Sequence, residues 1–283
     1  MIYKCNDCGR ALNWNIEQQR LVCSCGSTNY KEIDNTSEVT CDICGSRLNT
    51  KDIVQLCENC GSSVVNVNNK DFSGISLAKV KPSEIKNLID NHINKYGFAK
   101  NYNRMQYKLV YLPYWLVDGE CRITSKLNSM TMVFENEPVY AGKDNILDYN
   151  NLDFNSGIDD VRKFDHKYLF GSVTKSYDMR EQIITRQILT EIKKEIKKYL
   201  DDKNVAIESV NIEFEPIGKM LVLLPIYEVN LDKYTLYINA QTGKVFGDVP
   251  TSIQKVVVYK LLKYTALAFA VFTLLFMGGA LQV

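Results

Sequence analysis

The residues best suited to chemistry in this chain of 283 residues are eight cysteines near the N-terminus. Two thiolates about three residues apart can chelate one metal ion, and a glycine after them permits the positive φ that turns backbone amides toward sulfur. The cysteines form four such pairs, each followed by glycine: Cys5 and Cys8, Cys23 and Cys25, Cys41 and Cys44, and Cys57 and Cys60. This spacing predicts two structural Zn²⁺ ions, each held by four cysteines.

The lengths of chain between the pairs indicate how they combine. Fourteen residues separate Cys8 from Cys23 and twelve separate Cys44 from Cys57, which suits hairpins that bring consecutive pairs to one ion. The alternative is an interleaved arrangement, first pair with third and second with fourth. The second pair, Cys23-Ser24-Cys25, is one residue short, so its geometry is expected to be asymmetric and ligation by both thiols stays open. Four thiolates leave no open coordination position, which argues against catalytic zinc.

A reducing compartment is expected for these thiols. No apolar secretory segment precedes Cys5, and paired cysteines inside the cell are typical of metal sites rather than disulfides. A redox role fits poorly because no βαβ pattern surrounds the pairs. The ninth cysteine, Cys121, stands alone in a strand-like segment and is expected to be a small buried apolar residue.

The elements that position the cysteines are short. Strand-like pieces at residues 11–14 and 20–22 lie between the pairs of the first unit. A unit of roughly 25 residues buries too little apolar surface to fold alone. Zinc would supply the missing stability, about 10–16 kcal/mol by analogy with zinc-finger peptides. We therefore expect two zinc ribbons, at residues 1–34 and 35–69.

The charge of these ribbons argues against nucleic-acid binding. Residues 1–69 hold six basic and eight acidic side chains, a formal charge of −2 before the thiolates are counted. Affinity for nucleic acid depends on neutralising phosphates, which requires the opposite sign. The whole chain is close to neutral at +1 and indicates no polyanionic partner either. A protein-interaction or structural module is the expected role of the ribbons.

Two helices are predicted downstream. The first begins at Pro82 and ends before Gly97, and the second opens at Asp178 with Glu181 as its capping-box partner. Apolar residues recur at helical spacing in both: Ile85, Leu88, Ile89 and Ile93, then Ile184, Ile188, Ile192, Ile196 and Tyr199. His92 lies along the first stripe and is expected to be structural rather than a metal ligand.

Two polar stretches each leave an alternative open. The second helix carries Lys193, Lys194, Lys197 and Lys198 beside its apolar face, interspersed with Glu191 and Glu195. This surface is interpreted as an ordinary solvated face, with contact to anionic lipid headgroups as the alternative. The Asx-rich segment 144–159 is interpreted as a solvated loop, because the EF-hand spacing that a calcium site would need is absent.

The strand-like segments contain an internal echo. Strands are expected within 109–123, at 205–215 and 220–231, and at 234–240 before a turn at 239–244. The stretch 109–118 can be laid on 221–230 at an offset of 112, with Leu, Val, Leu, Pro and Val coinciding. Proline inside a strand marks an edge or a bulge. We expect one α+β domain of two related helix-plus-antiparallel-sheet halves, at 70–176 and 177–250; chance similarity is the alternative.

The last twenty residues, 264–283, contain no Asp, Glu, Lys, Arg or His. At ~1.5 Å rise per residue a helix of this length spans about 30 Å, the thickness of a bilayer's hydrocarbon core. We expect a transmembrane helix within residues 251–283 that contacts lipid through residues 256–283. Lys255, Lys260 and Lys263 flank its N-terminal end, so the positive-inside tendency places the preceding domains in the cytoplasm. The alternative is a buried core helix of a soluble domain.

Taken together, the chain resembles a bacterial family of membrane proteins with TFIIB-type zinc ribbons. The resemblance rests on YKCNDCGRALNW, LVCSCGS, VTCDICGS and LCENCGSSVV, then on LVYLPYWLVDGE, LLPIYEVN and YTLYINAQTGKVFGDVP. The segment CSC departs from the family's usual CxxC, and residues 124–176 match weakly. The strand ending at NAQTGK also resembles PepSY-like modules. The resemblance implies a non-enzymatic membrane-anchored protein, often encoded beside flotillin-like (SPFH-domain) scaffolds.

The expected function is that of a cytoplasmic adaptor at the inner membrane that recruits or organises a protein partner, with an SPFH protein suggested by the resemblance. The alternative is a membrane-tethered nucleic-acid-binding regulator. An enzyme is not expected, because His92 and His166 are the only histidines and no nucleophile–base motif surrounds them. The sequence sets neither the identity of the partner nor the oligomeric state.

Overall fold

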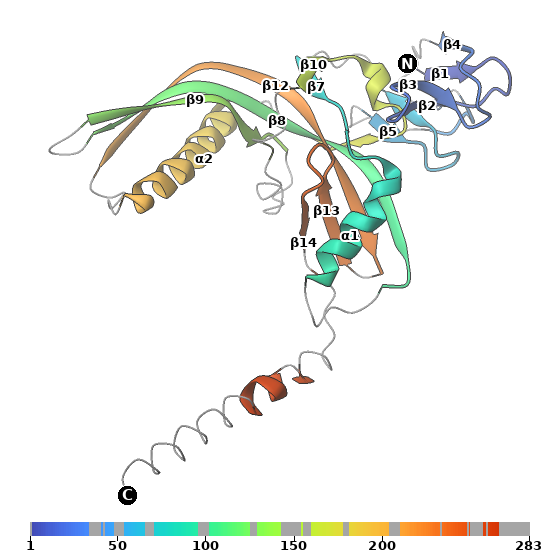
Figure 1. Ribbon diagram of the computed structural model, residues 1–283. Helices are drawn as coiled ribbons and strands as arrows, with labels where there is room; N and C mark the ends of the chain where they lie inside the picture. Colours follow the sequence, from blue (N-terminus) through green and yellow to red (C-terminus); the bar gives the residue numbers. More distant parts are fainter. Residues whose placement is uncertain are drawn as a thin grey trace, which may run out of the picture.

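Figure 1 shows a computed structural model of the protein. It describes residues 2–33, 41, 43–47, 54–65, 71–95, 102–124, 129–142, 154, 160–177, 181–203, 210–232, 234–247, 249, 257, 258 and 260–265. The fold is mixed helix and sheet, an α+β architecture in which two small cysteine-bearing units accompany a larger sheet.

The cysteine-bearing units are built from two-stranded antiparallel ladders. The three ladders pair β1 (Ile2–Cys5) with β4 (Tyr30–Ile33), β2 (Leu12–Asn15) with β3 (Arg20–Cys23), and β5 (Val54–Leu56) with β6 (Ser63–Val65). Leu12 and Leu21 are buried, so the small apolar content of the first unit points inward. The hairpin expected between the first two cysteine pairs is formed by β2 and β3.

Two long strands make the backbone of the larger sheet. β8 (Met105–Thr124) runs antiparallel to β12 (Asn211–Leu231) along its whole length, and the sheet arches from one end of the molecule to the other (Figure 1). Six shorter strands complete this eight-stranded sheet: β7 (Gly74–Ser76), β9 (Ser129–Tyr140), β10 (Val161–Lys163), β11 (Val173–Thr174), β13 (Tyr234–Asn239) and β14 (Val245–Gly247). At its centre both faces are buried, because Tyr111 packs in one cluster and Val110 and Leu112 pack in another.

Two helices cover opposite ends of the sheet. A 3₁₀ turn, η1 (Pro82–Glu84), leads into α1 (Ile85–Asn94), whose Ile85, Ile89 and Ile93 are buried against β12 and β13. The helix α2 (Glu181–Asp202) lies beneath the arch (Figure 1) and buries Ile188, Ile192, Ile196 and Leu200 against β8 and β9. The periodic stripes that predicted both helices are therefore the faces that they bury.

The two halves of the sheet repeat one order of elements, β7–α1–β8–β9 and β11–α2–β12–β13. Their short first strands cross over. β7 runs parallel to β12 at Val222 and Leu223, whereas β11 runs parallel to β8 at Val110 and Tyr111, the same places at an offset of 112. Each helix likewise packs on the hairpin of the other half, α1 on β12–β13 and α2 on β8–β9. The halves are thus interlocked.

The two prolines of the echo occupy equivalent places. On β8, Pro113 falls between the residues that pair with β11 and those that pair with β9, and its carbonyl accepts a hydrogen bond from Ala141 N (2.9 Å). On β12, Pro225 falls between the β7 and β13 pairings, and its carbonyl accepts from Ala240 N (3.1 Å). Proline lacks an N–H, so it fits where one neighbouring strand ends and the next begins.

Several sequence-based boundaries need correction. Residues 211–231 form the single strand β12 rather than two strands, and Pro216 and Gly218 mark a bulge in it. The segment 109–123, read from the sequence as one or two strands, lies in the single strand β8. Residues 124–176, for which the sequence predicted no helix or strand, contain β9, β10, the 3₁₀ turn η4 (His166–Leu169) and β11. Of the expected Asx-rich loop at 144–159, the structure describes Phe154 alone, which is buried, and the capping residue Asp178 lies outside the described residues.

Within the C-terminal segment, the described residues 257, 258 and 260–265 are helical. Across the described part of the chain, no helix combines the length and the apolar character that crossing a membrane requires. Residues 266–283 of the expected transmembrane helix lie outside the described residues.

Candidate metal centres

The structure gathers the eight paired cysteines into two groups of four. In the first, Cys5 Sγ lies 3.7 Å from Cys25 Sγ and Cys8 Sγ lies 3.3 Å from Cys23 Sγ. All four sulfur atoms of this group lie within 4.8 Å of one another. Both Cys23 and Cys25 therefore join the cluster, although their pair is one residue shorter than the others.

The second group joins the third and fourth pairs. Cys41 Sγ lies 3.7 Å from Cys60 Sγ, and Cys44 Sγ lies 3.5 Å from Cys57 Sγ. These four sulfurs also lie within 4.8 Å of one another. Consecutive pairs thus combine, and the interleaved arrangement is ruled out.

Both clusters fit a tetrahedral metal ion. Metal–sulfur bonds of about 2.3 Å in tetrahedral geometry place neighbouring sulfurs about 3.8 Å apart. Two sulfur–sulfur distances in each cluster, 3.3–3.7 Å, are close to that value, and the others are within 4.8 Å, so little movement is needed to accept an ion. Each cluster can therefore hold one metal ion with a complete shell of four thiolates.

Local backbone geometry explains why the pairs form these clusters. The glycine after each pair has positive φ, from 72° at Gly61 to 86° at Gly26. In the three ordinary pairs the glycine N–H donates to the carbonyl of the first cysteine four residues back, as from Gly45 to Cys41 (2.7 Å). In the short pair Gly26 N donates to Cys23 O (2.9 Å), three residues back. A tighter turn thus absorbs the missing residue.

Each cluster has a buried side and an exposed side. The first cysteine of each pair is buried and the second is exposed: Cys5, Cys23, Cys41 and Cys57 against Cys8, Cys25, Cys44 and Cys60. An ion held between them is anchored to the interior of its unit, and the outer thiolates give a chelator or an exchanging metal a route of approach.

Burial, backbone amides and neighbouring thiols shift the pKa values of thiols in the first cluster in opposite directions. Burial raises the pKa of the Cys5 thiol, but hydrogen bonds from the Cys8 and Asp7 amides outweigh it and hold the pKa at about 6. A hydrogen bond from the Arg10 amide lowers the pKa of Cys8. The hydrogen bond between Cys8 Sγ and Cys23 Sγ, together with burial, outweighs this and raises the pKa of Cys8 to about 12.

The second cluster shows the same split. Burial raises the pKa of Cys41 to about 12, whereas the hydroxyl and amide of Ser46 lower the pKa of Cys44 to about 6. An entering metal ion must displace the protons that the high-pKa thiols retain, so metal affinity should fall as the pH is lowered.

The first unit is packed against the sheet domain, a contact that no pattern in the sequence predicts. The Tyr3 ring meets the Phe170 ring edge-on with centroids 5.0 Å apart, and Trp14 meets Tyr168 at 4.8 Å. The backbone N–H of Trp14 donates to the backbone carbonyl of Phe170 (2.9 Å). The sequence shows aromatic residues in the first unit and in the sheet domain, but no local pattern predicts that these residues contact one another.

The second unit contacts the same part of the domain. Val54, at the start of β5, is buried and its N–H donates to Thr174 Oγ1 of β11 (3.1 Å). β11 also pairs with β8. It therefore links the second unit to the central sheet.

The remaining candidate residues lie away from the clusters in sequence and in element. Cys121 lies in β8 and is fully buried, as expected of a small apolar residue. His92 lies in α1, and burial lowers its pKa. His166 lies in η4, with its ring 4.9 Å from the Phe164 ring.

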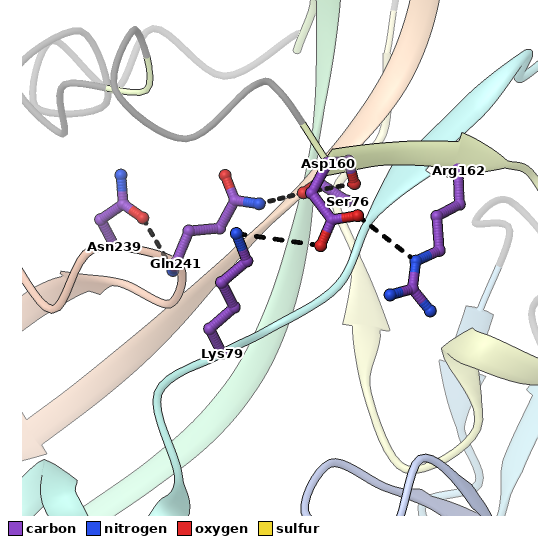
Figure 2. A network of polar contacts seen from close by, with 6 residues as sticks. All are labelled: Ser76, Lys79, Asp160, Arg162, Asn239 and Gln241. Carbon is purple, nitrogen blue, oxygen red and sulfur yellow. Dashed lines mark hydrogen bonds and ion pairs between the residues drawn. The ribbon is translucent and has the colours of Figure 1, made fainter.

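A buried polar network joins β7 to the turn after β13 (Figure 2). The Gln241 side-chain amide donates to Ser76 Oγ, which in turn contacts Asp160 O (3.4 Å), and Asn239 Oδ1 accepts from Gln241 N (2.9 Å). At its exposed edge the Asp160 carboxylate pairs with Lys79 and Arg162. Among the described residues, buried Gln241 Oε1 has no hydrogen-bond partner. The network holds the NAQTGK turn against the sheet, which is a structural role.

Comparison with models of protein families, with curated proteins and with solved structures gave no match.

Proposed function

We propose that this protein is a non-catalytic adaptor that is stapled by two zinc ions and anchored in a membrane by its C-terminal segment. The observation that carries the proposal is that each cluster offers four sulfur ligands, which lie within 4.8 Å of one another. A metal ion held there has no free position for substrate or water, which is the arrangement of a structural site.

Zinc is the proposed metal. A tetrahedral set of four thiolates suits Zn²⁺ or iron, and zinc is the usual ion in short ribbons with this ligand spacing. Elemental analysis of the purified full-length chain should find about two zinc ions per chain, and the protein should be colourless. A red protein containing iron instead would contradict the choice of metal and leave the clusters intact.

The membrane anchor is proposed from residues 264–283, which carry no charged side chain. Their length matches a bilayer's hydrocarbon core, and Lys255, Lys260 and Lys263 precede them, as at the cytoplasmic end of a span. The full-length chain should sediment with membranes and resist extraction by alkaline carbonate. A chain truncated after Lys255 should become soluble; if it still sediments with membranes, the segment is not the anchor.

The proposed activity is recruitment of a protein partner to the inner membrane. The ribbons are net acidic and packed against the domain, which leaves a compact cytoplasmic head suited to protein contacts. The resemblance to membrane zinc-ribbon proteins encoded beside SPFH scaffolds suggests a flotillin-like partner. Purification of the detergent-solubilised chain with its bound proteins, identified by mass spectrometry, tests this. Specific enrichment of an SPFH protein over a truncated control would support it, and its absence would contradict that choice of partner.

A further inference from the structure

The outward side of α2 concentrates positive charge. Five basic side chains on this side are exposed: Arg186, Lys193, Lys194, Lys197 and Lys198. The apolar residues Ile188, Ile192 and Ile196 point the other way, into the core. At 100° per residue the five basic side chains fall in one sector of about 140° opposite the buried stripe. We call this set the α2 basic face.

Of the acidic residues of the helix, Asp201 lies within this sector, four residues after Lys197, whereas Glu191 and Glu195 lie beside it. Glu191 and Glu195 approach Glu137 of β9, and after burial their charges are the next cause of the raised pKa of Glu137. Of the α2 basic face, Lys194 pairs with Glu191 (2.6 Å). Within the described residues, Lys193, Lys197 and Lys198 form no ion pair with an acidic side chain. Five basic side chains thus share this sector with one acidic side chain, Asp201, which leaves a local excess of positive charge.

The position of α2 favours one kind of partner. The helix lies beneath the arch of the sheet, and the continuation of the chain beyond β14, in its described residues 257, 258 and 260–265, lies on the same side of the arch (Figure 1). That continuation contains exposed Lys260 and Lys263 and then the uncharged residues 266–283. A surface tethered next to a bilayer meets its headgroups at high effective concentration, so weak individual attractions become sufficient.

We propose that the α2 basic face contacts the anionic headgroups of the membrane in which the chain is anchored. The contact rests on the proposed anchor, and it fixes the orientation of the cytoplasmic head by a second attachment. Lysines near an anionic leaflet are attracted over about one Debye length, about 10 Å at 0.1 M salt, so the contact should weaken strongly in concentrated salt.

The test uses the full-length chain reconstituted into vesicles of phosphatidylcholine alone or with phosphatidylglycerol. Exposed lysines are acetylated with a water-soluble reagent and quantified by mass spectrometry. We expect acetylation of Lys193, Lys194, Lys197 and Lys198 to fall at least about threefold on the anionic vesicles and to recover in about 0.5 M salt. Exposed Lys31 and Lys95, which lie on other elements, should be acetylated equally on both vesicles.

A triple substitution provides a matched control. Lys193→Gln, Lys197→Gln and Lys198→Gln together remove exposed charge without touching the core, and they should abolish the protection of Lys194. The triple variant Lys31→Gln, Lys86→Gln and Lys95→Gln removes the same charge elsewhere and should leave that protection intact. Protection of Lys194 that survives the first triple variant would overturn the proposal.

The remaining outcomes separate this contact from the anchor on which it rests. A chain that fails to float with either vesicle would overturn the anchor and this contact together. A chain that floats with both but is acetylated equally on them would overturn the lipid contact alone. Protection of the same lysines by duplex DNA on neutral vesicles, without protection by anionic lipid, would overturn it in favour of a nucleic-acid surface.

Discussion

Leu112 of β8 lies directly opposite Leu224 of β12 in the antiparallel ladder of the central sheet. The two leucines are also equivalent positions of the strand sequences that repeat at an offset of 112. A residue paired with its own equivalent marks an approximate two-fold axis through the sheet. The crossed pairings of β7 and β11 and the hydrogen bonds to Pro113 and Pro225 follow the same axis.

This relationship predicts matched effects of Leu112→Ala and Leu224→Ala. Both side chains are fully buried in the same cluster, so each truncation should lower the free energy of unfolding by about 2–5 kcal/mol. The two losses should agree within about 1 kcal/mol, and because the sites are neighbours the double variant should depart from additivity. Urea unfolding of the chain in detergent measures this. A large loss in one variant and almost none in the other would contradict the equivalence.

Removal of one cysteine from the second cluster should be felt at that cluster alone. Cys57→Ser deletes a buried ligand, so the chain should retain about one metal ion instead of two. Cys121→Ser is the matched control, since it changes a buried thiol that belongs to neither cluster. That control should keep both ions. Elemental analysis after gel filtration distinguishes the outcomes, and equal metal loss in the two variants would contradict the assignment of ligands.

The acidic flank of α2 predicts a pH dependence of stability. Burial, reinforced by Glu195 and Glu191, raises the pKa of Glu137 to about 7. The carboxyl of Glu137 therefore binds a proton more tightly in the folded state than in the unfolded state. The stability that this protonation contributes is fully present below about pH 4.5 and is lost as the pH rises through 7. Glu137→Gln stays neutral, so it should exceed the wild type in stability at about pH 8 by roughly 1–2 kcal/mol after allowance for partial exposure.

The measurement compares urea unfolding of the wild type and Glu137→Gln at about pH 5 and pH 8. The advantage of the variant should shrink at the lower pH, where the wild-type carboxyl is largely protonated in the folded state. Glu135→Gln removes one exposed charge from the same strand and serves as the matched control. An equal advantage at both pH values would show that titration of Glu137 is not its cause.

Local patterns were enough to predict the ligand clusters and the helices. The eight cysteines, their grouping by consecutive pairs and the positive φ of the glycines after them all follow from chelation over a few residues. The same holds for α1 and α2, because the isoleucines that set the helical period are the ones buried, as at Ile89 and Ile192. The period of the apolar residues shows which face of a helix is buried, so the sequence was enough to predict α1, α2 and their buried faces.

Long-range contacts were not predictable in the same way. Two strands were expected, at 205–215 and 220–231, but pairing with β8 on either side of Pro216 and Gly218 carries the single strand β12 through a bulge. The two-residue strand β11 has no period of its own and exists through its pairing with Val110 and Tyr111. The aromatic contact between Tyr3 and Phe170 joins residues that are far apart in the sequence, and no hydrophobic periodicity around Phe170 predicts it.

That aromatic contact predicts that the sheet domain helps the first cluster to retain its metal. Phe170 is fully buried, its ring packs edge-on against Tyr3 two residues before Cys5, and its carbonyl accepts from Trp14 N. Phe170→Ala removes an aromatic pair worth about 1 kcal/mol, so a chelator should withdraw one of the two ions about fivefold faster. The second ion should leave at the wild-type rate, because its unit is held through Val54 and Thr174.

Phe134→Ala is the matched control for this prediction. Phe134 is also buried and packs against Phe214 in the part of the sheet covered by α2. Both substitutions should lower the free energy of unfolding by about 3–5 kcal/mol, but only Phe170→Ala should hasten metal release. Transfer of zinc from the full-length chain to a chromophoric chelator gives the two rates. If both variants release zinc equally fast, general loss of stability is the cause; if Phe170→Ala alone shows one accelerated ion, the domain and the first cluster are energetically coupled.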